Sequence, residues 1–204
     1  MHDLESTKIL SAIVLSGGQS RRMQGVDKGL IKLGGKPMIS YVLESLSQHM
    51  SEISISTNSK EAAYQQLGYP LVVDELVGNI GPLAGIHAGL SITTTERLLV
   101  VPCDTPFLDI KLAQRLINAM EQDNARIAVA HDGERLQTTF AVIETSKRDS
   151  LTVYLKRGGR RLITWYKEEG AVEVDCSDVK ESFFNVNTMG DIEVAEEESK
   201  FRGK

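Results

Sequence analysis

Cysteine is scarce in this sequence, which contains only Cys103 and Cys176 among its 204 residues. The two lie far apart, and neither belongs to a Cys-x-x-Cys pair or has a histidine at the spacing of a metal site. This pattern argues against a disulfide framework and against a zinc site. Two free thiols are typical of a reducing compartment, so we expect a cytoplasmic protein.

Long hydrophobic runs and an excess of basic charge are also missing. No stretch approaches the roughly 18 apolar residues that a membrane-spanning helix needs, and the acidic residues 1–5 do not fit a signal peptide. The net charge of −5 argues against a nucleic-acid surface, which normally carries an excess of lysine and arginine. We therefore expect small-molecule substrates, with neither a membrane nor a nucleic acid as partner.

The chain is long enough to bury about 70% of its unfolded surface in one core, and no linker or repeat divides it. We expect a single domain over residues 1–204. Predicted strands at 9–15, 53–57, 71–74 and 98–101 alternate with predicted helices at 37–50, 60–67, 82–90 and 110–120, before a hairpin of strands 126–131 and 137–143 and a C-terminal helix from 192. This order predicts an α/β fold of the Rossmann-like, three-layer α/β/α kind, with a mostly parallel sheet and one late antiparallel strand.

A glycine-rich loop with three cations directly follows the first predicted strand. Gly17 and Gly18 allow the backbone to approach a ligand closely, so that successive N–H groups can point at one anion. Arg21, Arg22 and Lys28 can then supply positive charge to a polyphosphate. The spacing fits neither a Walker loop nor the dinucleotide-binding fingerprint. The loop predicts a phosphate-binding site, and a solvated basic turn is the alternative.

Polar side chains follow the next three predicted strands. Asn58 comes after the second, Asp74 ends the third and Asp104 comes after the fourth. Ligands of open α/β sheets bind outside the carboxyl ends of the strands, so we expect these side chains beside the loop. Capping of a following helix is the alternative role for each of them. Asp104 has the residue type and the place to bind Mg²⁺, which takes only one or two protein carboxylates beside phosphates and water.

Five sequence blocks, in order, resemble those of the molybdenum cofactor guanylyltransferases. They are the loop at 15–29 with its Leu-Ser-Gly-Gly, Arg-Met and Asp-Lys-Gly groups, Gly-Pro-Leu-Ala-Gly at 81–85, Pro-Cys-Asp-Thr-Pro-Phe at 102–107, Asp-Gly-Glu-Arg at 132–135 and Asn-Val-Asn-Thr at 185–188. The similarity covers about residues 9–195. Ser16 stands where the family usually has alanine, Gln137 and Thr138 stand where it often has His-Pro, and Met189 stands where proline often follows.

The resemblance implies a nucleotidyltransferase fold and a reaction that moves GMP from GTP to the molybdopterin-type cofactor with release of pyrophosphate. It implies Mg²⁺ as the metal, held by Asp104, and leaves room for transient contacts with proteins that deliver or receive the cofactor. The implied catalytic residues are Arg22, Lys28 and Asp104. The implied nucleotide-binding residues are Leu15, Ser16, Gly17, Gly18, Lys28, Asn58, Asp74 and Asp104. The implied molybdopterin-binding residues are Arg135, Arg161, Asn185 and Asn187.

Two other functions stay open at this point. The first is transfer to another acceptor or with another base, as in a cytidylyltransferase or a sugar- or polyol-phosphate nucleotidyltransferase. The second is a nucleotide-binding regulator without turnover, and Lys28 together with Asp104 argues against it, because such a protein has no chemical need for either. The preference for guanine rests on the resemblance alone. For Arg161, a solvated helix face is the alternative to a role in binding.

Overall fold

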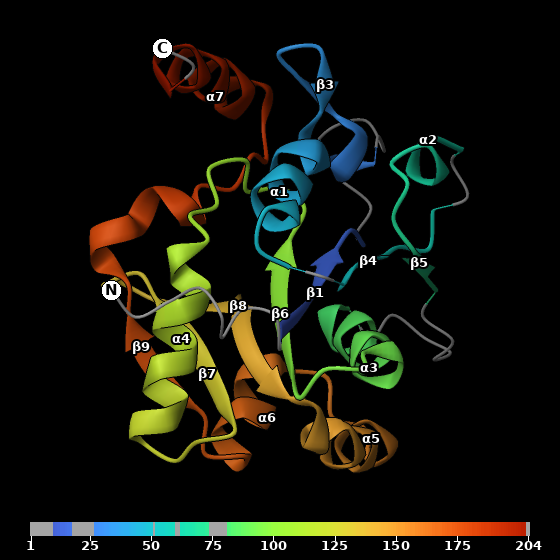
Figure 1. Cartoon of the computed structure of the whole chain (residues 1–204), viewed down its shortest axis with the longest axis vertical. Coiled ribbons are helices and arrows are strands. Elements are labelled where there is room, and N and C mark those ends of the chain that lie inside the picture. The colour runs from blue at the N-terminus through green and yellow to red at the C-terminus, as the bar shows by residue number, and fades with distance from the viewer. Residues whose placement is uncertain (1–9, 18–26, 51, 60–61, 74–80, 203–204) are drawn as a thin grey trace.

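A seven-stranded sheet forms the centre of the protein, and its strand order is β5-β4-β1-β6-β8-β7-β9 (Figure 1). The structure is a computed structural model that describes residues 10–17, 27–50, 52–59, 62–73 and 81–202. The strands are β1 (Leu10–Leu15), β4 (Glu52–Ser56), β5 (Leu71–Val72), β6 (Arg97–Pro102), β7 (Ile127–His131), β8 (Leu136–Glu144) and β9 (Val172–Asp175). Strand β8 runs antiparallel to both β6 and β7, whereas the other neighbours are parallel. The predicted mostly parallel sheet with one late antiparallel strand is confirmed.

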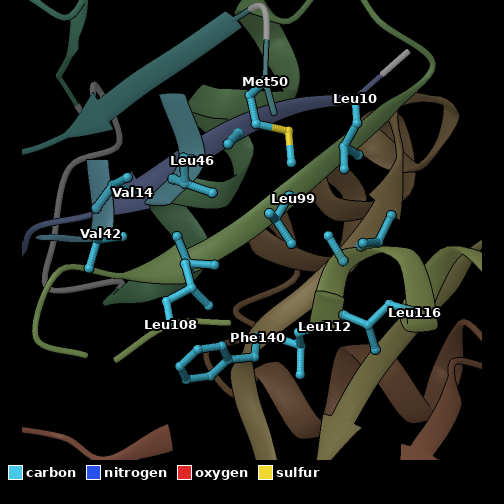
Figure 2. Close-up of a cluster of buried hydrophobic side chains, with 14 of the residues drawn as sticks. Leu10, Val14, Val42, Leu46, Met50, Leu99, Leu108, Leu112, Leu116 and Phe140 are labelled. Carbon is cyan, nitrogen blue, oxygen red and sulfur yellow. The ribbon is translucent and has the colours of Figure 1, made fainter. Parts of the chain in front are cut away.

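Helices cover both faces of this sheet. They are α1 (Met38–Ser47), α2 (Ala62–Gln65), α3 (Pro82–Ile92), α4 (Lys111–Gln122), α5 (Arg148–Lys156), α6 (Leu162–Glu168) and α7 (Met189–Arg202), with 3-10 helices η3 (Lys28–Leu30), η4 (Thr145–Lys147) and η5 (Ser177–Phe183). Successive residues of a strand point to opposite faces, so Val14 packs with α1 and α4 while Ile13 packs with α3, α5 and α6. Figure 2 shows the first of these two layers, in which Leu46 of α1 and Leu112 of α4 join the sheet residues. The three-layer prediction is therefore confirmed.

Several short elements differ from the sequence-based prediction. Pro37 is not the first residue of a helix: its extended backbone pairs with Lys32 in a hairpin of β2 (Lys32–Leu33) and β3 (Lys36–Pro37), and α1 begins one residue later. The helix predicted at 60–67 is described only as the short α2. The C-terminal helix begins at Met189 rather than 192, because Thr188 and Asp191 cap its first turn. The sequence patterns do not predict helices α5 and α6 or strand β9.

The carboxyl ends of the central parallel strands meet at one edge of the sheet. Leu15 at the end of β1 lies opposite Ser56 of β4 on one side and Pro102 of β6 on the other. The residues that follow these three positions consequently leave the sheet together. In the part of the chain that the structure describes, no helix combines the length and the apolar character needed to cross a membrane.

Candidate active site

The described start of the predicted phosphate loop, Ser16 and Gly17, and the acidic end of β6 lie at this edge of the sheet. Ser16 donates its backbone N–H to the carbonyl of Ser56 over 2.8 Å, and Cys103 donates to the carbonyl of Leu15 over 3.1 Å. Gly17 is exposed, and among the described residues a Cβ built on it would contact nothing within 4 Å, so that part of the chain leaves the space beside it open. This open space is where the sequence predicts bound phosphates.

The expected nucleotide-side residues are only partly described. Asn58 follows β4 and is exposed at the same edge. Gly18, Arg22 and Asp74 lie outside the described residues, and their predicted roles stay predictions.

Lys28 contacts two of the other predicted site residues, Asp104 and Asn187. Its Nζ lies 3.1 Å from Oδ2 of Asp104 and donates a second, shorter hydrogen bond to Oδ1 of Asn187. The side chains of Lys28 and Asp104 are 27% and 14% exposed, so this ion pair is partly buried yet open to a ligand on one side. A lysine ammonium carries three donors. Two of them are occupied by these oxygens, and within the described residues the third donor is open to a further acceptor.

Asp104 is held in place by the backbone around it. It follows β6 by two residues, and its carbonyl accepts a hydrogen bond of 2.9 Å from the N–H of Val186. It does not cap the next helix, because at α4 the N–H of Lys111 donates to Oδ1 of Asp109 instead. The capping alternative for Asp104 is therefore wrong, and its carboxylate faces Lys28.

The segment 185–188 reaches this centre from the far end of the chain. Val186 is fully buried, and the side-chain N–H of Asn187 donates to the carbonyl of Asn185. Oδ2 of Asp191 accepts the backbone N–H groups of Asn187 and Thr188 at 2.8 Å each, while the N–H of Asp191 donates to Oγ1 of Thr188. This reciprocal cap fixes Asn187 against Lys28. Sequence reasoning missed Asp191, although the spacing Thr-x-x-Asp could have indicated it.

Oδ1 of Asn185 is a further acceptor at the site. The atom is buried and accepts no hydrogen bond from the described part of the chain. A buried amide oxygen without a partner is costly, so it is a natural place for a ligand donor or a cation. No cluster of three or more histidine, cysteine, aspartate or glutamate side chains that could hold a metal occurs among the described residues. A carboxylate and a few neutral oxygens nevertheless fit Mg²⁺, which leaves most of its coordination sphere to water and phosphates.

Arg135 lies on the hairpin between β7 and β8, at the same edge of the sheet. Oδ1 of Asp132 accepts the backbone N–H groups of Glu134 and Arg135 at 2.8 Å each, and Oδ2 accepts the side-chain N–H of Gln137. Burial opposes ionisation, but these donors prevail and lower the pKa of Asp132 to about 2. The Arg135 side chain is 74% exposed and its Nε lies 3.7 Å from Asp132. The hairpin therefore presents a fixed carboxylate and an accessible guanidinium.

A cavity of about 350 Å³ opens between this hairpin, η5 and α7. Aromatic walls of Phe107, Phe183 and Phe184 are joined by polar groups that include Lys180 and Glu134. Phe184, which lines this cavity, directly precedes Asn185 in the sequence.

Arg161 does not take part in the contact between Lys28, Asp104 and Asn187. It is the N-cap residue of α6, its side chain is exposed, and its carbonyl accepts a hydrogen bond of 2.9 Å from the hydroxyl of Tyr154. The structure thus brings Asn187 together with the nucleotide-side residues and places Arg161 in the layer formed by α5 and α6.

Comparison with known proteins agrees with this geometry. The sequence model of the MobA-like NTP transferase domain matches residues 12–171. The chain is 42% identical to a molybdenum cofactor guanylyltransferase of Histophilus somni (strain 2336), over 90% of this chain and 94% of that protein. It is 41% identical to the protein of the same name from Mannheimia succiniciproducens, over 91% and 98% of the two chains.

Solved structures give the same result for the fold. The crystal structure of molybdopterin-guanine dinucleotide biosynthesis protein A from Archaeoglobus fulgidus is 25% identical, with a TM-score of 0.78 over 93% of this chain and 98% of that chain. The 2-C-methyl-D-erythritol 4-phosphate cytidylyltransferase of Thermus thermophilus, at 15% identity and a TM-score of 0.69 over 92% and 98% of the two chains, shares the fold alone. The chain belongs to the MobA-like NTP transferase family, with the molybdenum cofactor guanylyltransferases as its relatives.

Proposed function

We propose that the protein transfers GMP from GTP to the molybdopterin-type molybdenum cofactor, forming the guanine dinucleotide cofactor and pyrophosphate. The observation that carries this proposal is the contact of Lys28 with both Asp104 and Asn187 at the carboxyl edge of the sheet. It joins the phosphate-loop, acidic and Asn-Val-Asn blocks of the sequence in one place. A relative that is 42% identical over 90% of this chain is named for this activity.

The reaction is an in-line displacement at the α-phosphorus of GTP. A phosphate oxygen of the cofactor forms the new P–O bond, the bond to the bridging oxygen of pyrophosphate breaks, and pyrophosphate leaves with the electron pair. This nucleophile is already ionised near neutral pH and needs no general base. Positioning and neutralisation of the phosphate charge must then supply most of the acceleration.

The residues of this chain divide that work. Lys28 keeps its contacts to Asp104 and Asn187 and uses its third donor for a phosphate oxygen of GTP. Asp104, together with Asn185, would supply hard oxygen ligands for Mg²⁺, which when bound would neutralise negative charge on the phosphates. Gly17 leaves room for the phosphates, and Ser16 and Leu15 hold that backbone on the sheet. Arg22, Gly18, Asn58 and Asp74 complete the nucleotide side in this proposal.

The cofactor is proposed to lie on the other side of Lys28. The aromatic cavity beside Phe184 suits a flat pterin ring system, and Arg135 suits a phosphate or a ring carbonyl. Arg161 extends this side only if the cofactor reaches the start of α6. Both cysteines are buried and free, which supports a reducing, cytoplasmic setting for the enzyme.

Turnover with different nucleotides tests the proposal. The protein is incubated with Mg²⁺, molybdenum cofactor and one of GTP, CTP, ATP or UTP, and the dinucleotide product and pyrophosphate are quantified. We expect both products with GTP. Products with CTP alone would identify a cytidylyltransferase, and nucleotide binding without any product would favour a regulator.

A further inference from the structure

Tyr64 of α2 lies where the two described ends of the glycine-rich region meet. The residue is fully buried, and its hydroxyl donates a short hydrogen bond to Oδ1 of Asp27. The hydroxyl oxygen of Tyr64 also lies 2.5 Å from Oγ of Ser16. A tyrosine hydroxyl has one proton, and a carboxylate only accepts. The proton therefore points to Asp27, and Ser16 is the donor to Tyr64. One hydroxyl thus joins the residue after β1 to the residue before Lys28.

Asp27 transmits this contact to the turn that carries Lys28. It is the N-cap residue of η3, and its Oδ1 also accepts the backbone N–H of Gly29 over 3.2 Å. Its carbonyl accepts the N–H of Leu30 over 3.0 Å. Lys28 is the first residue of this short helix, so the orientation of Asp27 sets the point from which Lys28 reaches Asp104.

The packing around the hydroxyl is tight on the side that faces Gly29 of this turn. A Cβ on Gly29 would lie 2.6 Å from Oγ of Ser16 and 2.7 Å from the hydroxyl oxygen of Tyr64, closer than real Cβ contacts allow. Burial, together with the hydrogen bond to Asp27, raises the pKa of Tyr64 well above its usual value. The hydroxyl consequently keeps the proton that it donates to Asp27.

We propose that Tyr64 is a positioning residue for guanylyl transfer, which holds Lys28 at the reacting phosphates through Asp27. This inference rests on the proposed function. It assigns a catalytic consequence to a buried side chain that none of the five sequence blocks contains. Ser16 adds a second hydrogen bond to the same hydroxyl.

The test compares Tyr64→Phe with Tyr166→Phe. Both changes delete one hydroxyl from a fully buried ring. Tyr166 lies in the core layer on the opposite face of the sheet from Tyr64, and its hydroxyl donates to the carbonyl of Thr138. We expect Tyr64→Phe to lower kcat about tenfold to a hundredfold, the scale of a misplaced catalytic group. We expect both variants to lower the melting temperature, and Tyr166→Phe to keep the kcat and KM of the original protein.

A double-mutant cycle with Lys28→Ala shows whether Tyr64 acts through Lys28. In the Lys28→Ala background, Tyr64→Phe should cause no further loss of kcat, because there is no ammonium left to position. Losses that multiply in the double variant would overturn the inference. A loss of melting temperature in Tyr64→Phe with unchanged kcat would overturn it as well and leave Tyr64 a structural residue.

A binding measurement separates this inference from the proposed function. Tyr64→Phe should weaken the binding of Mg²⁺-GTP at least about fivefold more than the binding of guanosine, which lacks the phosphates that Lys28 meets. If the original protein binds Mg²⁺-GTP more tightly than guanosine but forms no dinucleotide, the proposed function fails. The effect of Tyr64→Phe on the ratio of the two affinities still tests the role of Tyr64 in that case. Equal weakening of GTP and guanosine would overturn the inference.

Discussion

Lys28 and Asn187 are 159 residues apart in the sequence, yet the ammonium of Lys28 donates to the side-chain oxygen of Asn187 while it also pairs with Asp104 at 3.1 Å. The glycine-rich loop and the segment before α7 are thereby joined through one charged group. Because a lysine moves as a point charge on a flexible stem, two fixed acceptors are needed to aim it. Asp104 and Asn187 provide those acceptors, and the predictions below probe each of the three residues.

Asp104→Asn tests the acidic partner. The change keeps the size of the side chain and removes its charge, so an interaction that strengthens as charge develops on the phosphates is lost. We expect turnover to fall by far more than tenfold, while GTP still binds weakly and the protein stays folded. Asp109→Asn is the control, since asparagine keeps the side-chain oxygen that accepts the N–H of Lys111 at the start of α4, and it should leave both stability and turnover nearly unchanged. Activity above about a tenth of the original, a change of only about 1.4 kcal/mol, would refute metal binding by Asp104.

Lys28→Ala tests the charge that faces the nucleotide. We expect the affinity for Mg²⁺-GTP to fall much more than the affinity for guanosine, because the third donor of the ammonium meets phosphates that guanosine lacks. Titration calorimetry with the two ligands measures the difference. Lys36→Ala serves as the control, since Lys36 forms an exposed pair with Glu44 and its variant should bind both ligands as before. A variant of Lys28 that loses both affinities equally would place the lysine away from the phosphates.

Asn187→Ala and Arg161→Ala should differ, although the sequence alone groups both residues on the cofactor side. Without Asn187, Lys28 loses one of its two acceptors, so we expect the GTP affinity to fall roughly tenfold to a hundredfold, the scale of one hydrogen bond to a charged group, together with turnover. Arg161 has no part in that contact and should leave GTP affinity unchanged. Binding of GTP and of the cofactor is measured separately for each variant. GTP affinity that is unchanged in Asn187→Ala would return Asn187 to the cofactor side alone.

The part of this site that the sequence predicts is the part encoded by local patterns. Strand β1 followed by Ser16 and Gly17, and strand β6 followed by Asp104, are visible because an apolar run ends at a turn or polar residue and parallel strands share their carboxyl edge. The pairing of Lys28 with Asn187 has no local signal, since only the tertiary fold brings these segments together. Tyr64 is missed for the same reason, since a tyrosine in a short polar helix is typical of many surfaces.

Elements that are short or partly exposed also could not be predicted from the sequence. Helix α6 has seven residues and β9 has four, too few for a hydrophobic period to stand out. Pro37 fits the first turn of a helix as well as an extended hairpin position, and only the pairing of Pro37 with Lys32 decides between them. Local propensity therefore gave the layers of the fold, whereas long-range contacts decided these details.

Asp132 makes the stability of the hairpin depend on pH in the acid range. The pKa of its carboxyl is about 2 in the folded protein against an ordinary value of 3.8, so the unfolded chain binds the proton more readily. The stabilisation is complete above the ordinary value and is lost as the pH falls through 3.8 toward 2. Asp132→Asn should thus lower the free energy of unfolding by on the order of 1 kcal/mol at about pH 6, given the nearby solvent, and by progressively less below about pH 4.

Urea unfolding of both proteins at several pH values from about 6 down to about 3 measures this difference. Gln137→Met provides a second variant, because it removes one of the donors that hold the pKa of Asp132 low. In that variant the folded and unfolded pKa values lie closer together, so the free energy of unfolding should vary less steeply with pH below about 4. A difference between the original protein and Asp132→Asn that stays constant across this pH range would show that Asp132 does not stabilise the hairpin through its charge.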